Sequence, residues 1–361
     1  MLSWQKICDW LRLNRWNFIS LNFYGLRWQI SVSDLSFDYK GKALFLIMVI
    51  SVVSIFITYV CVLLGLAFFT LLERKGLGYI QVRKGPNKVG VMGLPQPLAD
   101  ATKLLTKEIR KPVLVNRLPY FIAPILRLIL ALILWQLNPR VSGILLIKLG
   151  FLFFLCVSRI NVYGTLLAGW GSNSKYALLG AIRAIAQTIS YEVRLALILL
   201  FSLFISLSLE LIKVQEYQSF IWFVFLLFPI AMVWFVSCIA ETNRAPFDFA
   251  EGESELVSGF NVEYGAGGFA LIFIAEYANI LLIRLLCSVL FFGGRFLLYV
   301  SMDLFLCLKI LFFCFRFVWV RVTLPRFRYD LLIALTWKGF LPFSLSRLCA
   351  VLGILFLFEF W

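Results

Sequence analysis

Histidine is absent from the 361 residues, and so are clustered cysteines. Imidazole is the commonest metal ligand in proteins, and haem needs an axial ligand held in a built pocket. Iron–sulfur clusters need grouped cysteines, whereas the eight cysteines here are scattered and include no Cys-x-x-Cys pair. We therefore expect no metal site on this chain, and we expect its cysteines to be small buried hydrophobic residues.

Charge is also scarce, because charged residues make up 15% of the chain and hydrophobic residues 62%. A soluble domain of this length needs far more charged surface. Long apolar runs recur, and each can cross the roughly 30 Å hydrocarbon core of a bilayer. The alternation typical of a membrane β-barrel is missing. The sequence therefore predicts an all-α polytopic membrane protein.

The few charges are unbalanced, with 34 Lys and Arg against 19 Asp and Glu and a net charge of +15. In a soluble protein this excess favours nucleic acid as a partner. Here the positive side chains lie mainly in loops beside apolar runs, where membrane orientation and anionic headgroups account for them. We therefore expect lipids, and no nucleic acid, among the partners.

Apolar length predicts about eight transmembrane helices. Their expected positions are 43–72, 119–137, 144–169, 177–209, 218–240, 266–292, 298–320 and 340–360. Eight spans place the polar segments 73–118, 170–176, 241–265 and 321–339 on one side. The first of these segments holds ten Lys and Arg, so the positive-inside rule assigns that side to the cytoplasm or the mitochondrial matrix.

The first 42 residues form an extension ahead of a single membrane domain at 43–361. They interleave six Lys and Arg with four tryptophans and lack the apolar core of a secretory signal. We interpret this extension as an interfacial helix, with a targeting presequence as the alternative.

A second amphipathic segment begins near Leu94. Leu94, Leu98, Ala101 and Leu105 share one face of a helix, and polar residues occupy another. This pattern predicts a helix lying in the membrane interface, with an ordinary solvated surface helix as the alternative.

Acidic residues concentrate at the end of the fifth apolar run, where Arg244 is the one neighbouring cation. Six fall within about 23 residues: Glu241, Asp248, Glu251, Glu253, Glu255 and Glu263. A carboxylate costs roughly 2.5–3.5 kcal/mol at mid-bilayer, so this accumulation indicates a protein that handles protons or cations. If the segment is helical, Asp248, Glu251 and Glu255 share a face and at least one pKa rises. A solvated acidic loop is the alternative.

Two further acids, Glu192 and Glu276, lie inside apolar runs. At about 100° per residue, Glu192 lies roughly opposite Arg183 on its helix, and Arg284 is two turns from Glu276. Each carboxylate therefore needs a partner, a proton or water from another segment. An ion pair between helices is one interpretation, and a proton-conducting chain of carboxylates and water is the other.

The last polar segment contains Arg321-Val-Thr-Leu-Pro-Arg-Phe-Arg-Tyr-Asp330, which is both basic and aromatic. This composition favours an anchor in lipid headgroups or a site for the polar head of a ligand. The pattern alone leaves both interpretations open.

Two long motifs are similar to the signatures of a known family. They are Gly93-Leu-Pro-Gln-Pro-Leu-Ala-Asp-Ala-Thr-Lys-Leu-Leu-Thr-Lys-Glu108 and Pro246-Phe-Asp-Phe-Ala-Glu-Gly-Glu-Ser-Glu-Leu-Val-Ser-Gly259. Stretches within 73–87, 172–193 and 325–330 resemble it too, and the likeness runs from about residue 43 to the C-terminus. The chain resembles the quinone-site membrane subunits of respiratory complex I (NADH:ubiquinone oxidoreductase), the family of the mitochondrial subunit 1 and its bacterial counterparts.

The resemblance implies eight helices around a lipid-accessible tunnel for ubiquinone. By position, the residues that line or shape the tunnel and its loops are Glu73, Arg74, Arg83, Phe247, Arg321 and Arg326. An acidic path that couples quinone reduction to proton translocation then involves Glu192, Glu241, Asp248, Glu251, Glu253, Glu255 and Glu276. A newly charged quinone shifts the pKa values of nearby groups, which supplies the coupling.

The resemblance also implies a subunit without a redox centre, metal or flavin of its own. Its expected partners are the hydrophilic quinone-site and iron–sulfur subunits, adjacent membrane-arm subunits, ubiquinone and lipids. The expected location is the mitochondrial inner membrane, with a bacterial plasma membrane as the alternative. Arg194 stands where the family pattern has a small or neutral residue, and it is a candidate partner for Glu192.

Two other functions use the same carboxylates. One is the equivalent subunit of a membrane-bound hydrogenase-type complex, and the other is a stand-alone proton or ion transporter. The arginines of the first polar segment favour the respiratory form, and the internal repeats typical of transporters are not evident. A purely structural subunit leaves Glu192 and Glu276 unexplained.

Overall fold

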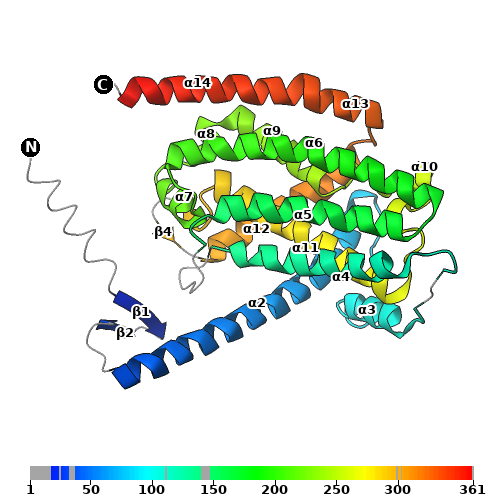
Figure 1. Cartoon of the computed structure of the whole chain (residues 1–361), viewed down its shortest axis with the longest axis horizontal. Coiled ribbons are helices and arrows are strands. Elements are labelled where there is room, and N and C mark those ends of the chain that lie inside the picture. The colour runs from blue at the N-terminus through cyan, green and yellow to red at the C-terminus, as the bar shows by residue number, and fades with distance from the viewer. Residues whose placement is uncertain are drawn as a thin grey trace, which may run out of the picture. The chain divides into compact units, whose positions relative to one another are not determined.

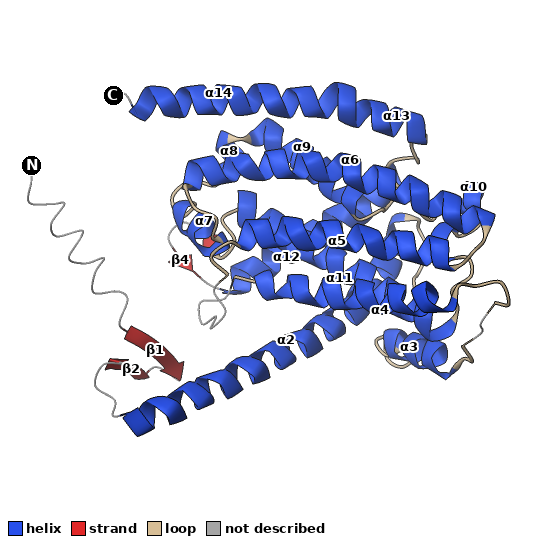
Figure 2. Ribbon diagram, viewed as in Figure 1, coloured by secondary structure: helices blue, strands red, loops and turns tan. Residues whose placement is uncertain are grey.

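The computed structural model describes residues 18–23, 26–31, 37–109, 112–139, 147–297, 300–301 and 303–359 (Figures 1 and 2). The chain divides into two compact units, 1–58 and 59–361. Helices dominate the described residues (Figure 2), in agreement with an all-α membrane protein.

In the first unit, strands β1 (Phe18–Phe23) and β2 (Leu26–Ser31) pair antiparallel. The residues of β2, Leu-Arg-Trp-Gln-Ile-Ser, alternate apolar and polar side chains, which is the period of a strand. The interfacial helix expected for the first 42 residues is therefore wrong at 18–31, and residues 1–17 lie outside the described part. Helix α2 (Phe37–Ile80) begins in this unit.

Four long helices carry much of the second unit: α4 (Arg117–Leu134), α5 (Gly150–Gly171), α6 (Lys175–Ser206) and α11 (Ala266–Phe291). Helix α4 packs on α5 and α11, and α5 packs on α6 (Figure 1). Small residues permit this close approach, since a methyl group at Gly169 of α5 would collide with the Cβ of Ala181 in α6.

Shorter elements complete the second unit. They are α3 (Gln96–Thr106), η3 (Trp135–Leu137), α7 (Leu211–Tyr217), α8 (Phe223–Leu226), α9 (Phe228–Glu241), α10 (Glu253–Leu256), η4 (Gly259–Asn261), β3 (Phe296–Leu297), β4 (Val300–Ser301), α12 (Asp303–Thr323), α13 (Tyr329–Ala334), the π-helix η5 (Leu335–Phe340) and α14 (Leu341–Glu359). Helices α9 and α14 pack against α6, and α12 packs against α11.

Within the described residues, five helices are long and apolar enough to cross a membrane. They cover Val49–Ile80, Arg117–Leu137, Gly150–Gly171, Lys175–Ser206 and Ala266–Phe291. These helices coincide with five of the expected spans and confirm the all-α polytopic class. Helices α12 and α14 occupy the positions expected for the seventh and eighth spans.

The fifth expected span, at 218–240, is not one continuous helix. Helix α9 holds only 14 residues, which at 1.5 Å per residue is roughly 21 Å. Pro229 lies in its first turn, has no amide hydrogen and in a continuous helix would clash with the carbonyl four residues before it. The sequence is continuously apolar here, but the helix is interrupted between α8 and α9.

The polar segment expected at 321–339 is also different from the prediction. Only residues 324–328 lack helical structure, because α13 and η5 lead directly into α14. The C-terminal helix therefore begins earlier than expected, because α13 and η5 add about three turns of mostly apolar helix before α14.

Polar segments from distant parts of the sequence meet at one end of the second unit, which we call the acidic end. The Tyr120 hydroxyl donates to the backbone oxygen of Glu263 (3.0 Å), and the amide of Phe327 donates to that of Pro246 (3.1 Å). Helices α3, α10 and α13 all lie toward this end in Figure 1. The grouping agrees with the sides expected from counting eight spans.

The other end of the same helices, called the opposite end, contains α7, α8 and residues 292–297. The side chain of Gln218 accepts a hydrogen bond from the amide of Gly293 (2.8 Å) and donates to the carbonyls of Val289 and Leu290 (3.0 Å each). These bonds join the segment before α8 to the last turn of α11.

The cysteines divide by exposure. Those buried in the described structure are Cys238, Cys287 and Cys314, and those exposed are Cys61, Cys156, Cys307 and Cys349. The expectation of burial is therefore wrong for four of them, while Cys8 lies outside the described residues. An apolar side chain on the outer face of a membrane helix meets lipid rather than water, so such exposure costs little.

Candidate functional site

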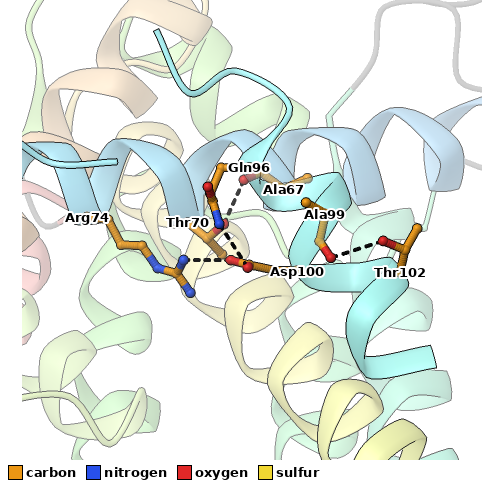
Figure 3. Close-up of polar contacts among 7 residues, drawn as sticks. All are labelled: Ala67, Thr70, Arg74, Gln96, Ala99, Asp100 and Thr102. Atoms are coloured by element: carbon orange, nitrogen blue, oxygen red, sulfur yellow. Dashed lines mark hydrogen bonds and ion pairs between the residues drawn. The ribbon is translucent and has the colours of Figure 1, made fainter. Parts of the chain in front are cut away.

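Asp100 joins α3 to the end of α2, as Figure 3 shows. One carboxylate oxygen lies 2.6 Å from a guanidinium nitrogen of Arg74, and the other accepts a hydrogen bond of 3.0 Å from Gln96. A hydrogen bond to an ionised carboxylate is stronger than a neutral one. Arg74, one of the predicted tunnel residues, therefore orients the amphipathic helix.

Helix α3 confirms the helical part of the second amphipathic prediction. None of its residues is buried, and Leu98 and Leu105 are 60% and 71% exposed. An exposed apolar face fits a helix that rests on lipid. Its location in the membrane interface remains a prediction.

Glu73 is buried at the acidic end between two arginines. Its carboxylate lies 2.5 Å from Arg321 and 3.6 Å from Arg244, and it accepts a hydrogen bond of 2.8 Å from the hydroxyl of Tyr277. The Arg244 guanidinium also stacks 4.6 Å from the centre of the Tyr277 ring. We call these four residues the Glu73 cluster. It carries two positive charges against one negative charge.

Arg83 does not join the Glu73 cluster in the described structure. It lies on an exposed loop, where its Nε donates to the side chain of Gln81 (2.9 Å). Of the three predicted tunnel residues in the first polar segment, only Glu73 is buried among charged and polar side chains, whereas Arg74 and Arg83 are exposed.

The acidic segment is not the helix that a shared face of carboxylates requires. Pro246 and Gly252 disfavour helical backbone, and helix α10 covers only four residues. Glu255 pairs with Arg183 at 2.5 Å, whereas Asp248 pairs with Arg326. The expected common face is therefore wrong. The side chain of Glu253 lies outside the described residues.

The loop at 324–328 clamps the start of this acidic segment. Arg326 lies 3.3 Å from the carboxylate of Asp248, and the ring of Phe327 stacks on that of Phe247 with centres 5.6 Å apart. Phe247 is buried. The basic and aromatic loop thus contacts protein through Arg326 and Phe327, two of the residues that suggested a headgroup anchor.

Among the acids of this loop, Glu251 has the most strongly raised pKa. Burial raises its pKa to about 8, and the negative charges of Glu276 and Asp248 add to the rise, while Arg244 and Arg127 oppose it. Burial also raises the pKa of Asp248, against the effect of Arg326. At least one raised pKa was expected from like charges, but burial is the larger cause.

Glu276 finds its partner on another helix. Its carboxylate lies 3.1 Å from a guanidinium nitrogen of Arg127 in α4, and the Arg127 side chain is 3% exposed. The same guanidinium lies 5.1 Å from the centre of the Phe260 ring. The predicted need for a group from a different segment is met by an ion pair between α4 and α11.

A small polar cavity adjoins this ion pair. About 30 Å³ is open to the centres of water molecules, and the lining residues are Arg127, Ser158, Asn161, Val162, Thr165, Thr188, Glu241, Thr242, Asn243, Glu276 and Asn279. Buried oxygens of Asn161, Asn279 and Glu241 have no hydrogen-bond partner among the described residues. A cavity of this size and polarity is large enough for water, because one water needs roughly 10–15 Å³ and two to four polar partners.

Glu192 follows Thr188, which lines the cavity, by about one turn of α6. It is buried on α6, its Oε1 has no hydrogen-bond partner among the described residues, and its charge interacts with that of Glu241. The candidate partner Arg194 instead stacks 4.1 Å from the ring centre of Tyr191 and 4.8 Å from that of Phe340. Arg194 follows Glu192 by two positions, and at about 100° per residue the two side chains lie on nearly opposite faces of α6.

Five predicted acids therefore form one series. Asp248 and Glu251 interact, Glu251 and Glu276 interact, and Glu276 and Glu241 line the same cavity. Glu241 and Glu192 interact in turn. We call this set the carboxylate series.

Sequence reasoning missed the polar partners of these acids. Arg127 and Asn161 are polar residues within apolar runs, and Asn279 follows Glu276 by three positions, which places both on one helical face. An isolated polar residue in a predicted span is the signal that identifies them. Tyr277, which contacts Glu73, gives no such signal.

The comparisons with known proteins agree along most of the chain. A family model described as NADH dehydrogenase matches residues 50–352. The chain is 54% identical over 305 residues to NADH-ubiquinone oxidoreductase chain 1 of Aedes aegypti, covering 84% of this chain and 96% of that protein. It is 56% identical over 301 residues to the protein of that name from Heterololigo bleekeri, covering 83% and 96%. With the one from Paracentrotus lividus it is 52% identical over 296 residues, covering 81% and 92%.

Proposed function

Because the chain belongs to the NADH dehydrogenase family, as a membrane subunit of NADH:ubiquinone oxidoreductase, we propose that it guides ubiquinone to the Glu73 cluster and couples its reduction to proton transfer. The observation that carries this proposal is the carboxylate series. Its members come from α6, α9, α11 and the acidic loop, and the cavity between Glu241 and Glu276 admits water.

Protons move along such a series because neighbouring carboxylates do not all ionise together. Each buried acid next to another retains or shares a proton, since two like charges in a medium of low polarity repel strongly. The water in the cavity bridges Glu241 and Glu276, which no direct hydrogen bond joins in the described structure. A proton that enters at Asp248 thereby reaches Glu192.

The Glu73 cluster supplies the electrostatic link to the quinone. Two guanidinium groups around one carboxylate leave a net positive charge, which stabilises the electron-rich head of a quinone as it is reduced. Arg244 also interacts with the charge of Glu276. A negative charge that forms beside Arg244 therefore weakens the stabilisation of the carboxylate series and raises its proton affinity.

The remaining parts of the reaction belong to other subunits. The hydrophilic quinone-site and iron–sulfur subunits deliver electrons and proton donors, and adjacent membrane-arm subunits continue the proton path. The positive charges of the acidic end favour an orientation in which it faces the matrix side of the mitochondrial inner membrane. The names of the relatives favour this respiratory assignment over a hydrogenase-type complex, a stand-alone transporter or a bacterial membrane.

The direct test is Glu241→Gln in the intact complex. We expect NADH:ubiquinone reductase activity and proton pumping in proteoliposomes to fall at least tenfold, because glutamine keeps the shape of the side chain but carries no transferable proton. Glu255→Gln is the matched control, since Glu255 is exposed and pairs only with Arg183 in the described structure. Unchanged turnover and pumping in a fully assembled Glu241→Gln complex would remove Glu241 from the mechanism.

A further inference from the structure

The opposite end carries a pocket that the proposed function does not use. Its volume is about 400 Å³, which is within the range of small-molecule sites. The lining residues are Trp222, Phe292, Phe305, Leu308, Lys309, Phe312 and Phe313. Six of these seven side chains are aromatic or aliphatic, so the walls select an apolar occupant.

The one charged lining residue, Lys309, is already fully engaged through its hydrogens. Its ammonium group donates to the carbonyls of Phe292 (2.6 Å), Gly294 (2.9 Å) and Phe296 (2.8 Å), just after the end of α11. An ammonium has three hydrogens, so none is left for a ligand. The positive charge remains and lies 4.8 Å from the ring centre of Trp222.

The pocket opens on the outer face of α12. Leu308 and Phe312 line it and are each 54% exposed, and Leu304, Leu311 and Phe315 continue the same exposed apolar surface. Because α12 occupies the position of an expected span, we expect this surface to meet hydrocarbon. No water fills an apolar recess there, and an empty recess forfeits the dispersion contacts of its walls.

We propose that this pocket holds one acyl chain of a membrane phospholipid. The chain enters from the lipid beside α12 and packs against Phe305, Leu308 and Phe312. Trp222 marks the interfacial level, as tryptophan does in membrane proteins. The charge of Lys309 at that level attracts the lipid phosphate without a direct hydrogen bond. The tail of a quinone whose head is at the Glu73 cluster would approach from the other end of the helices.

Photolabelling of the intact complex tests this assignment. The complex is reconstituted in phosphatidylcholine vesicles that contain a phosphatidylcholine with a diazirine on one acyl chain, irradiated, and analysed by peptide mass spectrometry. We expect adducts to concentrate on residues 305–313 and on Trp222 or Phe292. Leu308→Trp fills the pocket and lowers this labelling at least fivefold. Leu311→Trp adds the same bulk on the same exposed face, outside the pocket lining, and leaves the labelling unchanged.

Three outcomes overturn the proposal. Labelling that spreads evenly over the outer face of α12 and is equal in both variants removes the pocket as a lipid site. Labelling that an excess of long-tailed ubiquinone abolishes makes the occupant a quinone tail. Lipid adducts on other membrane-facing residues of the complex, with none on 305–313, mean that something other than a lipid covers the pocket. If Leu308→Trp prevents assembly, Leu308→Ala enlarges the pocket and must keep or increase the labelling. None of these readouts depends on proton coupling.

Discussion

The two ends of the helix bundle differ in how their buried charged groups are paired, although the side-chain nitrogen of Gln215 at the opposite end also lacks a hydrogen-bond partner among the described residues. At the opposite end, Gln218 and Lys309 donate their side-chain hydrogens to backbone carbonyls in well-formed bonds. At the acidic end, atoms of Glu192, Glu241 and Arg127 are buried without hydrogen-bond partners among the described residues.

The difference follows from what each arrangement can do. A polar group whose hydrogen bonds are complete stabilises one geometry and has no reason to change its protonation. Carboxylates that lack hydrogen-bond partners and adjoin a water-sized cavity can share a proton with a neighbouring carboxylate, so the proton is not fixed on one of them. Under the proposed function, the opposite end is therefore a structural anchor, while the acidic end retains the freedom that proton transfer needs.

The largest effect on stability is expected from Arg127→Met. It leaves the Glu276 carboxylate buried beside the cavity without its cation, and breaking a buried ion pair in this way costs about 3–5 kcal/mol. We expect loss of assembled complex on native electrophoresis. Arg183→Met is the matched control, because it breaks the more exposed pair with Glu255 and should cost at most about 1 kcal/mol. Equal assembly of the two variants would contradict the expectation that the Arg127–Glu276 pair contributes more to stability than the Arg183–Glu255 pair.

Lys309→Met tests the anchor at the opposite end. Methionine keeps the apolar stem but leaves three carbonyls after α11 without a donor, which we expect to cost about 2–4 kcal/mol. The measurement is the temperature at which the complex loses half of its NADH:ubiquinone reductase activity. Lys213→Met, which removes an exposed pair with Glu210, should leave that temperature nearly unchanged. If both variants behave alike, Lys309 is not an anchor.

A smaller effect should appear in the pH dependence of stability. The pKa of Glu251 is raised from 4.5 to about 8 by burial, Glu276 and Asp248. Its neutral form is favoured by folding, so its stabilising contribution is complete below about pH 4.5 and is lost as the pH rises toward about 8. Glu251→Gln should therefore flatten the decline in thermal stability between about pH 5 and 8, whereas Glu255→Gln should retain it. Parallel profiles would show that Glu251 does not titrate in this range.

The smallest effect is expected from Arg326→Ala. Arg326 is one third exposed and lies 3.3 Å from Asp248, so the pair contributes at most about 1 kcal/mol. Its loss should loosen the loop that clamps Phe247 and raise the apparent KM for ubiquinone about two- to fivefold, with kcat nearly unchanged. Arg83→Ala removes an exposed loop cation and should change neither constant. A larger rise in KM from Arg83→Ala than from Arg326→Ala would mean that the loop with Arg83, rather than the loop at 324–328, affects ubiquinone binding.

Several features were predictable because they are local. Apolar length located the long helices, and the spacing of Leu94, Leu98 and Leu105 located α3. The break before α9 was missed even though Pro229 is visible in the sequence, since an apolar composition carries no information about backbone hydrogen bonds. The strand at 26–31 was missed because the tryptophans were interpreted as membrane-interface residues, although Trp28 fits the period of two of its neighbours.

The sequence by itself determined the membrane class, the positions of the main helices and the concentration of acids beside α9. Only the tertiary structure decided which side chains those acids contact. Glu276 pairs with Arg127 across 149 positions, and Glu73 pairs with Arg321 across 248. Which buried charges meet depends on how helices pack, and helix packing joins residues that no local period relates. The same packing left the cavity between Glu241 and Glu276, which sets the acidic end apart from the opposite end.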